Sequence, residues 1–152
     1  MADGPRWRSV PRRSEGEGVS LLEVSHDAWM ARLGVRMERR LYLDGVAAEL
    51  RGEERFIPTK TLRGDRRRFV PFAIRFHLYP GVRASVARDG KSVLIRHGAE
   101  DGWWLRTDAA EVALAPSQRM VDGEPRGGEQ IVLSGVFRLE AGGKVRWKLG
   151  RG

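Results

Sequence analysis

The chain contains no cysteine, which excludes disulfide bonds and thiolate metal sites and leaves the redox compartment open. It also has no apolar run of about 18 residues, so we expect no membrane-spanning helix. Basic residues near the start are not followed by an apolar segment, so we expect no secretory signal peptide. No two of the three histidines have metal-ligand spacing, so we expect no metal and no cofactor within this chain.

Positive charge is what the chain has in excess. Its 28 Lys and Arg against 20 Asp and Glu give a net charge of +8. This balance favours polyanionic partners such as an acidic polysaccharide, a nucleic acid or an anionic surface, without choosing among them. A chain of 152 residues buries roughly 68–70% of its unfolded surface, which is enough for a core without disulfides.

Turn residues divide most of the chain into short apolar segments. We expect a flexible basic lead-in over residues 1–18 and a single β-domain over 19–152. Within this domain, one or two helical turns fit residues 27–34, with Asp27 as N-cap and Gly34 as C-cap, and an irregular excursion between two strands fits as well. The predicted strands cover 19–25, 35–43, 46–51, 55–59, 69–79, 82–88, 92–97, 103–107, 111–115, 130–138 and 144–149, with a loop over 118–128. About ten short strands at spacings of about 8–12 residues indicate an all-β, antiparallel β-sandwich with little helix.

The strand from Phe69 shows the strongest two-residue alternation. Its even-numbered positions from 72 to 78 are apolar, whereas Arg75, His77 and Tyr79 fall on the other face. Pro80 and Gly81 end this strand, and the dipeptide Asp89-Gly90 predicts a tight hairpin turn between the next two.

Three stretches carry a family resemblance: SHDAWMARLGVRMERRLYLDG, LRGEERF and FAIRFHLYPGVRASVARDGKSVLIR. They resemble the C-terminal β-domain of heparinase II/III-like polysaccharide lyases, over roughly residues 19–149. The resemblance implies an antiparallel β-sandwich that packs against an α/α-toroid, which holds most catalytic groups. It also implies β-elimination of uronic-acid-containing acidic polysaccharides and a location in the cell envelope or periplasm.

Several positions depart from the family pattern. The HxHxD-like and HNT-like segments of the family do not occur in this chain. Met37 stands where related sequences have a histidine, and a thioether cannot transfer a proton at neutral pH. Glu54 and Tyr79 replace an aspartate and a second histidine, and Ala28-Trp29 replaces Gly-Tyr.

β-Elimination needs a base, an acid and a cation that neutralises the sugar carboxylate, all around one sugar ring. His77 and Tyr79 are the strongest catalytic candidates, with Cα atoms roughly 6.5–7 Å apart on one strand face. Arg75 on the same face could bind the carboxylate. The alternative is that His77 is a hydrogen-bonded structural residue.

The other two histidines are weaker candidates. His26 with Asp27 could form a carboxylate-oriented imidazole, although an N-cap role for Asp27 explains that residue more simply. His97 precedes Gly98 at a strand end and fits a turn.

For substrate binding the candidates are Arg75, Arg39, Arg40 and Trp104, of which Trp104 has Arg106 on its face and could stack on a sugar. Core or interdomain packing is the alternative for Trp104, and Trp147 is expected in the core.

Three functions remain open. The first is a non-catalytic module of a lyase, whose partners are an acidic polysaccharide or a missing α/α-toroid, and which self-associates through the exposed docking surface. The second is a stand-alone binder of polyanions or nucleic acid, although the chain has no RNP-type aromatic signature. The third is a complete lyase built around His77, Tyr79 and Arg75.

Overall fold

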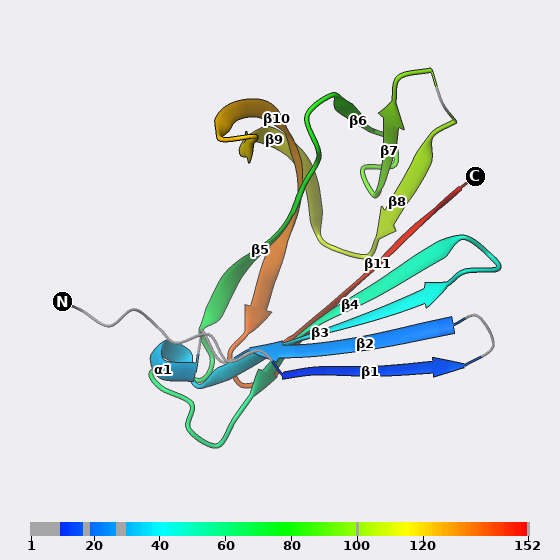
Figure 1. Ribbon diagram of the computed structural model, residues 1–152. Helices are drawn as coiled ribbons and strands as arrows, with labels where there is room; N and C mark the ends of the chain where they lie inside the picture. The colour runs from blue at the N-terminus through cyan, green and yellow to red at the C-terminus, as the bar shows by residue number, and fades with distance from the viewer. Residues whose placement is uncertain (1–9, 17–18, 27–29, 100, 152) are drawn as a thin grey trace. The chain divides into compact units, whose positions relative to one another are not determined.

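The computed structural model describes residues 10–16, 19–26, 30–99 and 101–151, with side chains from Arg32 onward (Figure 1). These residues form eleven β-strands that pair antiparallel and one four-residue helix. The elements are β1 (Val10–Gly16), β2 (Val19–His26), α1 (Met30–Leu33), β3 (Val35–Asp44), β4 (Glu49–Pro58), β5 (Phe69–His77), β6 (Val82–Val86), β7 (Ser92–His97), β8 (Trp103–Thr107), β9 (Glu111–Val121), β10 (Glu124–Arg138) and β11 (Gly143–Arg151). The predicted all-β, antiparallel fold of about ten strands with little helix is confirmed.

Two sheets contain all of these strands. One has the order β1-β2-β3-β4-β11-β8-β7-β6, and the other has the order β5-β10-β9. By contacts the chain divides into two compact units. Unit 1 comprises residues 1–71 and 136–146, and unit 2 comprises residues 72–135 and 147–152. The strands β5, β10 and β11 contribute residues to both units.

Unit 1 is built on the meander β1 to β4, in which each strand pairs with the next. Its core contains Val35 and a stacked pair of rings, Phe56 on β4 and Phe137 on β10, with centroids 4.7 Å apart. Side chains along a strand alternate between its two faces, so that residues two apart share a face and can reach the same core. Burying each such side chain stabilises the fold by about 1.5–3 kcal/mol.

Unit 2 is a sandwich. Phe76 of β5 packs edge-on against Trp147 of β11, with ring centroids 5.0 Å apart. Val70 and Ile74 of β5 are buried while Arg75 and His77 are exposed, so the predicted alternation of this strand is confirmed. Trp147 is 6% exposed and lies in the core, as the sequence predicts.

Three segments differ from the sequence-based expectation. β1 lies within the predicted lead-in, because its backbone pairs with β2 over seven positions despite its polar composition. Gly52 does not interrupt β4; it pairs with Leu41 and is buried. Residues 118–128 are not a loop but continue β9 and β10 around a turn at Asp122 and Gly123, both with positive φ.

The helical turns expected over 27–34 correspond to α1, which begins at Met30. Asp27, the predicted N-cap, lies outside the described residues. Gly34 has a φ of +70° directly after α1, which suits the left-handed conformation that ends many helices. In the described part of the chain, no helix has the length and apolar character that crossing a membrane requires.

Candidate functional site

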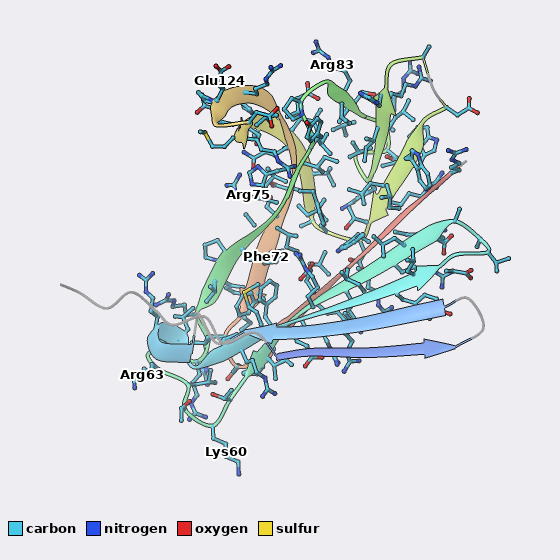
Figure 2. The ribbon with its side chains drawn as sticks, viewed as in Figure 1. Lys60, Arg63, Phe72, Arg75, Arg83 and Glu124 are labelled. Atoms are coloured by element: carbon cyan, nitrogen blue, oxygen red, sulfur yellow. The ribbon has the colours of Figure 1, made fainter. Side chains whose placement is uncertain are left out.

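The exposed face of β5 in unit 2 carries Arg75 and His77, two of the three residues that the sequence singles out for catalysis, and Figure 2 labels Arg75 there. Arg75 and His77 project from the strand, and Tyr79 follows in the turn that leads to β6. All three are exposed, Tyr79 by 54%. The strand therefore presents them on an open surface and not inside a cavity.

Each of these side chains contacts a neighbour from β9 or β10. His77 Nδ1 lies 2.6 Å from the hydroxyl of Ser117, which is 8% exposed. Arg75 donates to Gln130 Oε1 at 3.3 Å, and Gln130 in turn donates to the Pro116 carbonyl at 2.8 Å.

Tyr79 is in contact with a cation. The Arg119 guanidinium lies 5.5 Å from its ring centroid, a cation–π distance. Together with the bonds of His77 and Arg75, this contact gives each of the three candidates a structural partner of its own. His77 thus has a hydrogen-bonding partner within the sheet, which is what the structural alternative for this residue requires.

Arg39 and Arg40, the basic candidates of unit 1, are paired with carboxylates. Arg39 Nε lies 2.6 Å from Oε1 of Glu54, which is 3% exposed. Arg40 Nε lies 2.9 Å from Oε1 of Glu38. Both arginines therefore neutralise acidic groups of the same sheet.

Trp104 and Arg106 do share a face of β8, as the sequence predicts, with the guanidinium 5.6 Å from the ring centroid. Trp104 is half-buried and pairs with Leu94 of β7 and Gly150 of β11. This surface leaves part of the indole ring open to solvent. The ring can pack against a ligand or another domain, and the Arg106 cation beside it favours an anionic ligand.

The remaining histidines, His26 and His97, belong to β2 and β7. His26 pairs with Met37 through the backbone, while its side chain and Asp27 lie outside what the structure describes. His97 is exposed at the end of β7, next to Gly98 with a φ of +65°. In the described part of the chain, no three His, Asp or Glu side chains gather in a way that could hold a metal ion.

Hydrogen bonding shifts the pKa of two groups at turns. The pKa of Asp89 is lowered, first because the backbone N–H of Lys91 donates to its carboxylate and then because the Ser92 hydroxyl does. The pKa of Arg51 is raised by its hydrogen bond to Glu49 and by the charge of that residue. The hydrogen bonds of Asp89 stabilise the β6–β7 turn, whereas the Arg51–Glu49 pair lies within β4.

Sequence reasoning missed a groove of about 570 Å³ beside β6 in unit 2. Its walls come from the start of β6 and from the β9–β10 hairpin, of which residues 118–128 are predicted as a loop from the sequence. The dipeptide Asp122-Gly123 was the signal that could have revealed it, because this pair favours a two-residue hairpin turn.

Comparisons with known proteins agree with the fold. FtsZ-localized protein C of Caulobacter vibrioides is 49% identical over 153 aligned residues, which cover 98% of this chain and 26% of that protein. Heparan sulfate lyase HepC from Pedobacter heparinus has the same fold with a TM-score of 0.72 at 8% identity, over 97% of this chain and 22% of that one. A crystal structure of heparinase III gives a TM-score of 0.67 at 12% identity, over 95% of this chain and 21% of that one.

The chain thus spans about a quarter of the length of these relatives. A family model described as "Heparinase II/III-like, C-terminal" matches residues 2–148, almost the whole sequence. The chain belongs to the heparinase II/III-like C-terminal family.

Proposed function

We propose that this chain is a supporting β-domain of a longer heparinase II/III-like protein and does not cleave a glycosidic bond by itself. One observation carries the proposal: His77, Arg75 and Tyr79 are each in contact with a different neighbour on an open sheet face. β-Elimination requires three groups around a single sugar ring in a site that restricts water. The chain supplies no metal or organic cofactor site in this proposal.

The family reaction provides the test. The purified chain is incubated with heparan sulfate, hyaluronan and alginate, and the ultraviolet absorbance of unsaturated uronate is followed. We expect no rise above buffer for the wild type and for His77→Ala. His97→Ala is the control, because His77 and His97 are both exposed residues at strand ends. Turnover that is lost in His77→Ala but kept in His97→Ala would contradict the proposal and establish a complete lyase.

Partners follow from the same proposal. The remainder of the longer protein, an α/α-toroid in the lyases that the sequence resembles, would cover part of the β surface. An acidic polysaccharide would be attracted by the net charge of +8. Binding to DNA that is tighter than binding to heparin at each salt concentration would favour the alternative of a nucleic-acid-binding domain.

A second candidate function rests on sequence identity. The 49% identity to FtsZ-localized protein C far exceeds the 8–12% identity to the lyases, and a shared fold does not establish a shared function. The chain would then be a module of a protein that localises with FtsZ. Its location would be the site of FtsZ assembly, whereas the lyase resemblance implies the cell envelope.

A chimera separates these locations. The matching quarter of FtsZ-localized protein C is replaced by this chain, and a fluorescent fusion is imaged in Caulobacter beside a version from which that quarter is deleted. We expect the chimera to localise with FtsZ and the deletion to lose that position. A deletion that localises normally would show that this module does not direct localisation.

A further inference from the structure

The groove beside β6 has walls of a kind that accommodate an extended chain. It has a volume of about 570 Å³, within the range of ligand sites. All of its lining residues belong to unit 2, and they are Gly81, Val82, Arg83, Leu114, Ala115, Pro116, Gly127, Gly128 and Glu129. One wall is therefore a strand, a second is apolar and a third consists largely of glycine backbone.

The strand wall is the edge of a sheet. Among the described strands, β6 pairs with β7 alone. The hydrogen-bonding direction alternates along an antiparallel strand. The Ala87 N–H donates to the Ser92 carbonyl across this pair, so the odd-numbered residues face β7. The N–H and C=O groups of Val82, Ala84 and Val86 consequently point toward the free edge.

A carboxylate occupies one position on this edge. The Ala84 N–H donates to Glu129 Oε2 at 2.9 Å, where a neighbouring strand would supply a carbonyl oxygen. The Val82 N–H donates to the Tyr79 carbonyl. Within the described ranges, no protein group accepts the Val86 N–H or donates to the Ala84 carbonyl. The edge is short, but it retains the groups that pair with an added strand.

The glycine wall leaves room for another backbone. A Cβ atom added at Gly127 would meet no atom within 4 Å, so this side of the groove is open. The backbone of Gly127 is not in the left-handed region, and a side chain there would enter the groove without strain. This position therefore offers a way to block the groove.

Two pairs of arginines lie beside the groove, whose own lining holds Arg83 and one carboxylate, that of Glu129. Arg83 lies directly opposite Arg96 of β7, and Arg126 lies directly opposite Arg119 of the β9–β10 hairpin. Like charges in such pairs destabilise a sheet. In the part of the chain that the structure describes, no carboxylate pairs with Arg83, Arg96 or Arg126. Figure 2 shows Arg83 projecting away from the ribbon at β6.

We propose that the groove beside β6 binds an acidic peptide segment, which adds to the edge of the sheet as a further antiparallel or parallel strand. Main-chain hydrogen bonds to the Ala84 carbonyl and the Val86 N–H provide affinity, as in other cases of β-strand addition. Val82 lines the groove together with Leu114 and Pro116, so an apolar residue of the peptide fits next to Val82. In the added strand, the residues next to Arg83 alternate with the apolar ones. Acidic residues at those positions relieve the repulsion between Arg83 and Arg96.

The test uses the full chain and a fluorescein-labelled heptapeptide of alternating Val and Glu, with the Val/Lys peptide as its counterpart. Fluorescence anisotropy measures the dissociation constants. We expect the Val/Glu peptide to bind at least roughly tenfold more tightly than the Val/Lys peptide. Arg83→Glu and Gly127→Trp should each weaken the Val/Glu complex by about tenfold or more. Arg88→Glu, an equal charge change at an exposed residue outside the groove, should stay within about twofold.

Amide hydrogen exchange distinguishes strand addition from charge attraction alone. A saturating Val/Glu peptide should slow exchange at the Val86 N–H, which gains an acceptor, and a thermal melt of each variant confirms its folding. An unchanged exchange rate at Val86 would overturn the proposal. A heparin hexasaccharide that binds more tightly than the peptide, and is weakened by Arg83→Glu but not by Gly127→Trp, would assign these arginines to a glycan and overturn it as well.

Discussion

Arg39 on β3 lies directly opposite Glu54 on β4, and its Nε is 2.6 Å from Glu54 Oε1. The carboxylate is almost completely buried, whereas the side chain of Arg39 is 42% exposed. A buried carboxylate loses its hydration and needs a charged or hydrogen-bonding partner in the fold. Arg39 thus contributes to the stability of unit 1.

Removing this arginine tests that role. Arg39→Ala should lower the free energy of unfolding by roughly 2–3 kcal/mol, less than for a fully buried pair because Arg39 is partly solvated. Arg51→Ala is the matched control, since its pair with Glu49 lies at the surface and should contribute much less to the free energy of unfolding. Urea denaturation of both variants measures the difference. Equal losses in the free energy of unfolding would show that the burial of Glu54 does not determine how much its ion pair with Arg39 stabilises the fold.

The sequence could not place this ion pair because the register of a hairpin depends on its turn. A tight turn at Asp44-Gly45, as the sequence suggests, would put Leu50 opposite Arg39. In the structure β3 ends at Asp44 and β4 begins at Glu49, and Ala48 adopts a φ of +50° in the connection. Strands and alternation follow from local pattern, but the residue that faces a given side chain depends on loop conformation.

Gly142 allows a second, independent test of unit 1. Its φ is +72°, and a Cβ atom there would overlap the backbone of Phe56, which cannot move away as a side chain would. Gly142→Ala should therefore destabilise the fold by about 3 kcal/mol or more, the sum of left-handed strain and overlap.

Gly123→Ala is the control for Gly142→Ala. Its φ of +79° is similar, but a Cβ atom there meets nothing within 4 Å. Strain alone should cost about 1–2 kcal/mol. Thermal or urea unfolding of both variants gives the two values, and similar losses would mean that the contact with Phe56 is relieved at little cost.

Asp89 in the β6–β7 turn makes stability depend on pH. Hydrogen bonds from the Lys91 N–H and the Ser92 hydroxyl lower its pKa in the folded state. A lowered folded pKa means that the stabilisation is complete above the unfolded pKa of about 3.9 and is lost as the pH falls through the folded value. Asp89→Ala should be less stable than the wild type at pH 6, with a difference that shrinks toward pH 2.5. A difference that is independent of pH would contradict this role.

In the candidate site, too, the local sequence pattern predicts which face of a strand a residue occupies, but not which residue of another strand it contacts. Arg75 and His77 were placed correctly on one exposed face, because alternation alone decides the face of a strand. Their neighbours Gln130 and Ser117 lie 55 and 40 residues away in sequence, so no local pattern reveals the hydrogen bonds. The groove depends on the β9–β10 hairpin, whose polar arms are solvated on both sides and therefore lack the apolar alternation that marks a strand.

The last prediction concerns the apolar residues that unit 1 exposes to solvent. Phe69 and Val136 are 65% and 61% exposed. The Leu139 N–H donates to the Arg68 carbonyl, and this antiparallel register makes Phe69 and Val136 diagonal neighbours on one face of β5 and β10. Adjacent exposed apolar side chains of this kind mark surfaces that another domain or another copy covers.

The isolated chain should consequently bind an anilinonaphthalene sulfonate dye and self-associate in sedimentation experiments. The double variant Phe69→Ser/Val136→Ser should reduce both the dye fluorescence and the association, because these side chains form the patch. Val46→Ser is the control, since Val46 is 88% exposed in the β3–β4 connection, away from the patch in sequence and strand register. A dye signal that Val46→Ser lowers as much as the double variant would mean that exposed apolar residues act singly, with no docking surface on β5 and β10.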